Sequence, residues 1–123
     1  MRLAACAAAR STARLERQPR RPVDYWLEQR RSVRYDSNND SWKRWHLPGD
    51  RPQPYAVYVD DTDAVWLSDW GANAILRFDP KTEKFETFPL PDSYASVRQL
   101  AGRKGEIWGA ESAADKLFMI KSE

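Results

Sequence analysis

The sequence predicts an all-β fold, a partial β-propeller of about two to two and a half four-stranded antiparallel blades, and an internal repeat is the main reason. RYDSNNDSWKRWHLP at 34–48 returns as RFDPKTEKFETFPLP at 77–91, and WLSDWGANAI at 66–75 returns as WGAESAADKL at 108–117, with offsets of 43 and 42 residues. A period near forty residues with aromatic, β-rich segments is typical of propeller blades. Because a closed ring takes roughly 4–8 blades, two repeats cannot close one.

The composition indicates a β-rich chain that does not span a membrane. Six Trp, five Tyr and four Phe among 123 residues supply ring surface for packed sheets, while 31% of the residues are charged. The mean hydropathy is −0.78, and no apolar run approaches the roughly 18–20 residues of a spanning helix. The sequence therefore predicts no transmembrane segment.

The net charge of +2 hides an asymmetry between the first 22 residues and the rest. Residues 1–22 hold six Arg against Glu16 alone, a net of +5, which leaves 14 basic and 17 acidic side chains, a net of −3, on residues 23–123. The repeated part is mildly acidic and has no basic stripe beside a stacking platform. The sequence therefore predicts no nucleic-acid partner.

Residues 1–22 are rich in Arg and Ala, and we expect a disordered or weakly helical leader there. Leu3-Ala4-Ala5-Cys6 is similar to a bacterial lipobox, but only two residues precede it, so the hydrophobic stretch of a signal peptide is missing. An Arg-rich transit peptide fits the composition alone. A disordered leader or a mis-set start fits the segment better than either. Cys6 is the only cysteine, which excludes a disulfide within one chain.

The first segment after the leader, 23–48, is predicted to be the end of a blade. WLEQ at 26–29 aligns with WLSD at 66–69 at an offset of 40. From this Trp to the next recurring Arg there are 8 residues in the first copy and 11 in the second, so we expect a shorter first hairpin. The segment ends at Leu47-Pro48, and proline is tolerated at a sheet edge because it lacks a ladder donor. Its last strand is therefore predicted to be an outer strand.

The second segment, 54–90, is predicted to be a full blade. PYAVYVDD at 54–61 alternates apolar and polar residues, and three more strands are expected at 65–67, 74–78 and 84–88. DPKT at 79–82 is a turn sequence, since Asp bonds its own backbone and Pro presets the next dihedral angle. The last strand again runs into Leu-Pro, which predicts a second outer strand.

The third segment, 96–121, is predicted to be an incomplete blade of three strands. Trp108 recurs where Trp66 stands, and we expect both, together with Trp26, to pack between sheets rather than to stack on a ligand. A partial ring leaves apolar sheet faces and at least one strand edge uncovered. Association with a partner is therefore expected.

VYVDDTDAVWLSDWGANAILRFDPKTEKFETFPLP at 57–91 resembles the blades of the virginiamycin B lyase family, bacterial seven-bladed propellers also called streptogramin lyases. The shared pattern is Trp-x-x-acid, Gly or Ala, Ile or Leu, Arg, Phe or Tyr, Asp-Pro, an aromatic residue and Pro-Leu-Pro. Related lactonase-like and NHL-type propellers share much of it. The resemblance covers about 23–121 and implies a C-terminal fragment, since a full member needs roughly seven repeats. It also implies a bacterial cytoplasm or periplasm, between which the leader does not decide.

The resemblance implies an enzyme that opens the ester ring of a cyclic depsipeptide antibiotic by elimination. A base removes the proton α to the ester carbonyl, Mg²⁺ polarises that carbonyl, and the alkoxy oxygen leaves. In the family the base is a His two residues after the acid of the Trp-x-x-acid strand. Asp69 and Glu111 match the acid, with Gln29 in the partial repeat. The positions that match the His hold Gly71, Ala113 and Arg31. The sequence therefore assigns no catalytic residue and leaves open whether the chain is an enzyme.

Asp69 and Glu111 are the candidate magnesium ligands, because Mg²⁺ takes hard oxygen ligands. The competing interpretation, which we favour, is that acids recurring at blade corners accept hydrogen bonds from turn amides or pair with arginines. His46, the only histidine, falls on a predicted outer strand away from the ring axis and is expected to be a solvated surface residue.

Two functions are consistent with the sequence. The first is a truncated lyase-like propeller that is inactive alone. The second is a binding or scaffold module completed by self-association, with three or four copies supplying the blades, or by a partner chain. A small cyclic peptide is the ligand that the resemblance implies for a completed ring.

Overall fold

The computed structural model describes residues 23–28 and 30–122, and within the first strand it describes the side chain of Tyr25 only. The predicted leader at 1–22 lies outside the described residues. The division of the chain into a leader and three blade segments therefore stays a prediction.

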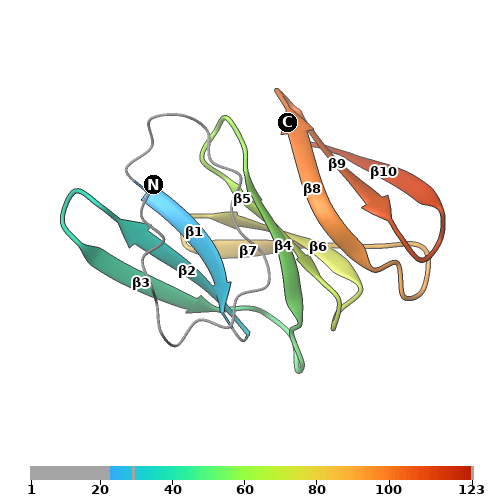
Figure 1. Ribbon diagram of the computed structural model, residues 1–123, viewed down its shortest axis with the longest axis horizontal. Helices are drawn as coiled ribbons and strands as arrows, with labels where there is room; N and C mark the ends of the chain where they lie inside the picture. Colours follow the sequence, from blue (N-terminus) through green and yellow to red (C-terminus); the bar gives the residue numbers. More distant parts are fainter. Residues whose placement is uncertain (1–22, 29, 123) are drawn as a thin grey trace.

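Ten strands form three antiparallel sheets, and no helix occurs among the described residues. The strands of each sheet are hydrogen-bonded in chain order. Figure 1 shows the three sheets side by side, with β4 between β1 and β8. The prediction of an all-β, propeller-like fold is confirmed. The first sheet holds β1 (Val23–Glu28), β2 (Arg31–Asp36) and β3 (Ser41–His46); the second β4 (Pro54–Val59), β5 (Val65–Asp69), β6 (Ala74–Asp79) and β7 (Lys84–Pro89); the third β8 (Val97–Arg103), β9 (Glu106–Glu111) and β10 (Lys116–Lys121).

The turns that lead into the outer strands β3 and β7 are built by aspartate, as the sequence predicts. The Asp36 carboxylate accepts a hydrogen bond from the Asn38 amide at 3.0 Å. The Asp79 carboxylate accepts one from the Lys81 amide at 2.8 Å, and the Glu83 amide closes the same turn on the Asp79 carbonyl at 2.7 Å. Asx-type turns of this kind fix where each outer strand begins. Because β3 and β7 each have one strand neighbour, they are the edge strands of their sheets.

The strand register shows which residues are equivalent in the first and second sheets. Tyr25 pairs with Arg34 across β1 and β2, and Trp66 pairs with Arg77 across β5 and β6. Arg34 and Arg77 are 43 residues apart, so Tyr25 occupies the place of Trp66. The alignment of Trp26 with Trp66 is therefore wrong by one residue. The side chain of Trp26 lies outside the described part of the chain.

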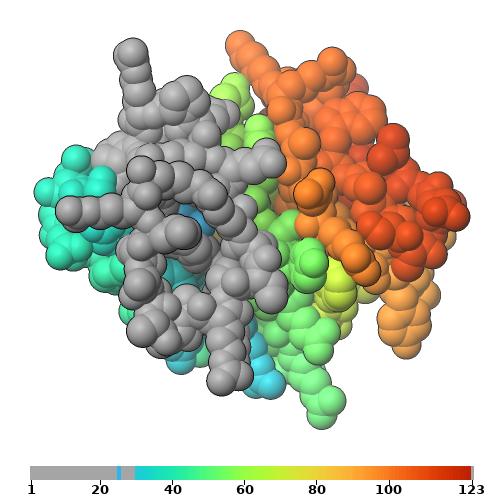
Figure 2. Space-filling model, viewed as in Figure 1, coloured from blue at the N-terminus to red at the C-terminus, as the bar shows by residue number. Residues whose placement is uncertain are grey.

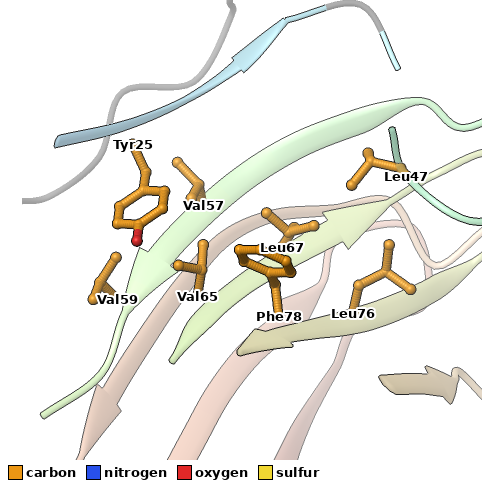
Figure 3. Close-up of a cluster of buried hydrophobic side chains, with 8 residues drawn as sticks. All are labelled: Tyr25, Leu47, Val57, Val59, Val65, Leu67, Leu76 and Phe78. Atoms are coloured by element: carbon orange, nitrogen blue, oxygen red, sulfur yellow. The ribbon is translucent and has the colours of Figure 1, made fainter. Parts of the chain in front are cut away.

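One apolar core fills the space between the first and second sheets. On the second sheet Val65 and Leu67 of β5, and Leu76 and Phe78 of β6, are two residues apart, which directs them to the face toward the first sheet. Trp45 of the outer strand β3 packs on Phe78, with ring centroids 4.7 Å apart. Phe85 of β7 packs on the same ring at 4.7 Å. Figure 3 shows the eight buried residues of this core: Tyr25, Leu47, Val57, Val59, Val65, Leu67, Leu76 and Phe78.

A second apolar core fills the space between the second and third sheets. Trp66 is at its centre with 0% of its surface exposed. The Trp66 indole donates a hydrogen bond to Asp60 at 2.8 Å, and Phe88 of β7 packs against the indole with ring centroids 5.7 Å apart. The second sheet is therefore covered on both faces, and every residue of β5 is buried. The buried members of the core are Ala56, Trp66, Ile75, Ala95, Val97, Leu100 and Ile107.

A side-chain clamp fixes the connection between the second and third sheets. Asn73 donates a hydrogen bond to the Asp92 carbonyl at 2.8 Å and accepts one from the Ala95 amide at 3.0 Å. Ser68 adds a bond to the Val97 carbonyl at 2.9 Å. The clamp determines where β8 begins relative to the hairpin between β5 and β6.

The far face of the third sheet carries exposed apolar side chains. Trp108, Leu117 and Met119 are exposed by 38%, 74% and 39%. Trp108 and Leu117 are equivalent to Trp66 and Ile75, which are both 0% exposed. Figure 2 shows the orange and red atoms of the third sheet at the opposite side of the molecule from β3. Trp66 and Trp108 were both expected to pack between sheets. Among the described residues Trp66 does so, whereas Trp108 is partly exposed.

We predict that the same substitution has different costs at the two equivalent tryptophans. Trp66→Ala removes a fully buried side chain and is expected to lower the free energy of unfolding by about 3–5 kcal/mol. Trp108→Ala removes a partly exposed side chain and is expected to cost about 1 kcal/mol or less. Urea denaturation followed by circular dichroism measures both. Equal losses would mean that Trp108 is covered in solution.

Candidate functional site

In each sheet the strand that is equivalent to β5 ends at an acidic residue. Asp69 ends β5 opposite Ala74, and Glu111 ends β9 opposite Lys116. In the first sheet the register places Glu28 there, opposite Arg31. The alignment that assigned Gln29 to this position is wrong by one residue, because the hairpin between β1 and β2 is shorter than the other two. Counting back from the paired strand β2 identifies Glu28.

Asp69 is buried and organises the turn that follows β5. It is 1% exposed. Its Oδ1 accepts hydrogen bonds from the amides of Gln53 at 2.7 Å, Gly71 at 2.9 Å and Ala72 at 3.4 Å. Its Oδ2 is buried and has no hydrogen-bond partner in the described part of the protein. One carboxylate oxygen therefore has a structural role, and the other keeps its lone pairs available.

Glu111 is the buried member of a cluster of three charged groups. It is 2% exposed, and its Oε2 lacks a hydrogen-bond partner among the described residues. Lys116 donates to both carboxylate oxygens of Asp92 at 2.9 Å. Burial raises the pKa of Glu111, and the neighbouring Asp92 raises it further. The hydrogen bond from Lys116 lowers the pKa of Asp92. Glu111 therefore keeps its proton to a higher pH than an ordinary glutamate does.

The positions that match the base in the related lyases are closed or empty in this fold. A Cβ at Gly71 would lie 1.9 Å from the Arg51 carbonyl oxygen, so no side chain fits there without movement of the backbone. Ala113 is exposed, and its amide bonds the Ala95 carbonyl at 3.2 Å. In the first sheet the hairpin between β1 and β2 is two residues shorter, so Arg30 corresponds to Asn73 and neither Arg31 nor Arg30 occupies the position of Gly71. Neither Gly71 nor Ala113 offers an acid–base side chain suited to proton abstraction at neutral pH.

His46 lies two strands from Glu28 at the same end of the first sheet, because it pairs with Arg31, which pairs with Glu28. It is the last residue of the outer strand β3 and is exposed. This agrees with the expected surface position.

The magnesium site at Asp69 and Glu111 stays a prediction. Both side chains offer an oxygen without a partner in the described residues, and carboxylate oxygens are the ligands that Mg²⁺ prefers. Within residues 23–28 and 30–122, no three or more His, Cys, Asp or Glu gather in a group that could hold a metal ion. Asp69 and Glu111 belong to neighbouring sheets, so any shared ion would need further ligands.

An aromatic stack lies directly beyond Asp69, at the seam of the second and third sheets. The rings of Tyr55 and Trp70 are stacked 4.4 Å apart with 7° between their planes. Arg98 lies over Trp70, 5.9 Å from the ring centroid. The Trp70 indole donates to the Val97 carbonyl at 2.8 Å. Tyr55, Arg98 and the Val97 carbonyl therefore all contact Trp70, and the stack strengthens the seam. Sequence reasoning did not identify it, because Ser112 replaces Trp70 in the next repeat.

The described residues include no helix long and apolar enough to cross a bilayer.

We predict that Gly71 is intolerant of any side chain. Gly71→Ala is expected to lower the free energy of unfolding by about 1–3 kcal/mol, because its Cβ meets the Arg51 carbonyl. The matched control is Ala113→Gly at the exposed equivalent position, with an expected cost of about 1 kcal/mol or less. Thermal unfolding of both variants tests this. A cost at residue 71 no larger than at residue 113 would contradict the contact.

We predict that Glu111 makes the protein less stable as the pH rises. A carboxyl group with a raised pKa in the folded chain binds more protons when folded, so stability falls as the pH rises above the ordinary value of about 4.5. Glu111→Gln should therefore raise the free energy of unfolding at neutral pH, and the gain should shrink as the pH approaches about 4.5. Urea titrations across this range measure the difference.

Glu86→Gln removes an exposed carboxylate from β7 and is the control for the loss of one negative charge. If the difference between Glu111→Gln and the parent chain does not change with pH, Glu111 does not titrate as described.

Comparisons with known proteins place the fold. No family model and no curated protein matches the sequence. Virginiamycin B lyase from Staphylococcus aureus matches with a TM-score of 0.65 and 16% identity, over 80% of this chain and 37% of the enzyme. A catalytically inactive form of that enzyme with quinupristin matches with a TM-score of 0.66 and 16% identity, over 81% of this chain and 38% of its own.

A luciferin-regenerating enzyme also matches, with a TM-score of 0.51 and 19% identity, over 72% of this chain and 33% of that enzyme. Because enzymes with different names share the architecture, the similarity describes the fold and not the activity. The chain spans less than two fifths of the length of the lyase. The resemblance found in the sequence is confirmed as one of structure: this chain has the fold of a segment of a β-propeller of the virginiamycin B lyase type.

Proposed function

We propose that the chain is a non-catalytic segment of a lyase-like propeller, a binding or scaffold module that works only when further sheets cover its open face. The observation that carries the proposal is the difference between two equivalent surfaces. Trp66 and Ile75 of the second sheet are fully covered by the third sheet, whereas Trp108 and Leu117 are exposed. A sheet face that repeats a packing face is suited to receive another sheet.

The proposed absence of catalysis is supported by the chemistry of the three equivalent strand ends. Elimination requires a base within reach of a carbon acid. Gly71 has no room for a side chain beside Arg51, Ala113 offers no group that titrates near neutral pH, and the shorter hairpin between β1 and β2 has no residue at the matching position. Glu111 is buried and has a raised pKa. A carboxyl group closed off from solvent is a poor base for a substrate that approaches from solvent.

We further propose that a completed ring binds a small cyclic peptide. The support is the similarity to a lyase solved with quinupristin and the buried carboxylate oxygens of Asp69 and Glu111, which would hold Mg²⁺ if further blades supplied the other ligands. Bound Mg²⁺ would polarise a ligand carbonyl. The residues described here supply orientation and charge but no proton acceptor.

Two measurements on the purified chain test the proposal. Size-exclusion chromatography with light scattering should show species larger than a monomer, and Trp108→Ser should shift them toward the monomer because it removes apolar surface from the open face. Lys104→Ser in the exposed turn between β8 and β9 is the control and should change nothing. Incubation with quinupristin and Mg²⁺ should give no ring opening by mass spectrometry.

Ring opening by the chain would contradict the non-catalytic assignment. A monodisperse monomer with intact β-sheet circular dichroism would contradict completion by a second copy.

A further inference from the structure

We propose that β10 accepts an antiparallel strand from a separate polypeptide, a strand that begins with an acidic residue and carries aromatic side chains at its second and fifth positions. The proposal rests on the proposed function and names the chemistry of the partner. Among the described residues β10 has one hydrogen-bonded neighbour, β9, so its other edge carries unpaired backbone groups. Figure 1 shows β10 at the outer side of the third sheet.

The first two sheets show what occupies this edge in each repeat. β10 is equivalent to β6, and β6 pairs with the outer strand β7. In β7 the second and fifth residues are Phe85 and Phe88, which pair with Phe78 and Ile75. In the first sheet the outer strand β3 repeats the arrangement with aromatic residues at the same two places. Two independent outer strands therefore share one pattern.

The aromatic residues of the outer strands serve opposite faces of the sheet. Phe85 packs on Phe78 in the core toward the first sheet, and Phe88 packs on Trp66 in the core toward the third sheet. By the same register, an outer strand on β10 would place its second residue opposite Ile120 and its fifth opposite Leu117. The fifth side chain would then reach Trp108, as Phe88 reaches Trp66.

The composition of β10 suits strand addition. Its sequence, KLFMIK, places four consecutive apolar residues between two lysines, and two of them, Phe118 and Ile120, have high β-propensity. An apolar edge without proline is a template for another strand, whereas β3 and β7 run directly into Leu-Pro and carry charged residues along the edge. Lys43, Arg44 and Glu86 are all exposed on those two strands.

Charge at the first position argues against β7 of a second copy and for a different partner. Lys84 begins β7 and pairs with Asp79 of β6. The residue of β10 at the place of Asp79 is Lys121, so Lys84 of a second copy would meet a like charge, which is unfavourable between directly paired residues. An acidic residue at the first position would meet an opposite charge. The partner strand is therefore of the form acid-aromatic-x-x-aromatic.

The test uses a fluorescent peptide of residues 81–91 of this chain with Lys84→Glu. We expect saturable binding to the full chain in fluorescence anisotropy, and slower amide hydrogen exchange in β10 when the peptide is present. The unchanged 81–91 peptide should bind about tenfold more weakly. A peptide with both phenylalanines replaced by serine is the control for the aromatic positions and should not bind.

Two variants of the chain test the register. Leu117→Glu places a carboxylate in the open face and should weaken binding about tenfold; the side chain is 74% exposed, so the fold should be retained, which circular dichroism checks. Lys121→Glu should reverse the preference, so that the unchanged peptide binds more tightly than the Lys84→Glu peptide. Lys104→Glu, in the adjacent turn, is the charge control and should leave the preference as it is.

Absence of peptide binding, or a preference that Lys121→Glu does not reverse, would overturn strand addition at β10. Neither result bears on quinupristin turnover or on association through the open face, which test the proposed function separately. Binding without slower exchange in β10 would also overturn the proposal, because it would place the peptide elsewhere.

Discussion

The burial of both faces of the second sheet is the constraint on which the rest of this structure depends. Trp66 and Ile75 close one face, and Leu67 and Phe78 close the other. Each fully buried large apolar side chain contributes roughly 1.5–3 kcal/mol, so these two seams supply most of the apolar stabilisation. The third sheet gains one seam only, and its exposed Trp108 is the direct consequence of that difference.

Much of the fold could be predicted from the sequence, because a repeat near forty residues, alternating apolar positions and aspartate turns all act locally. The strand register of the first sheet could not be predicted from the sequence. Its hairpin is shorter, so an alignment by tryptophan selected Trp26 and Gln29 where pairing with β2 selects Tyr25 and Glu28. Strand pairing is a property of two segments and is not visible in either segment alone.

The sequence predicted which residues lie at the candidate site, but it did not predict their hydrogen-bond partners or charged neighbours. The sequence identifies Asp69 and Glu111 as equivalent acids, yet their surroundings differ. Asp69 accepts three backbone amides, whereas Glu111 lies beside Asp92 and Lys116 from the following turn and strand. Equivalent acids in a repeat protein therefore have different partners, and at Glu111 burial and the neighbouring Asp92 raise the pKa. Position in the repeat is a guide to geometry, and the adjoining loops determine the local partners.

The Asn73 clamp gives the two seams unequal stiffness. The residue equivalent to Asn73 in the first sheet is Arg30, as the matching bonds from Leu90 to the Asn73 carbonyl and from Leu47 to the Arg30 carbonyl show. Arginine has no acceptor atom, and the place of Ala95 is taken by Pro52, which has no amide hydrogen to donate. The first seam therefore lacks the Asn73 clamp and is joined by its apolar core and by the Lys43–Glu83 ion pair, whereas the second seam combines an apolar core with the clamp. Any adjustment of blade angle that a closing ring demands would fall on the first seam, and the third sheet would move with the second as one piece.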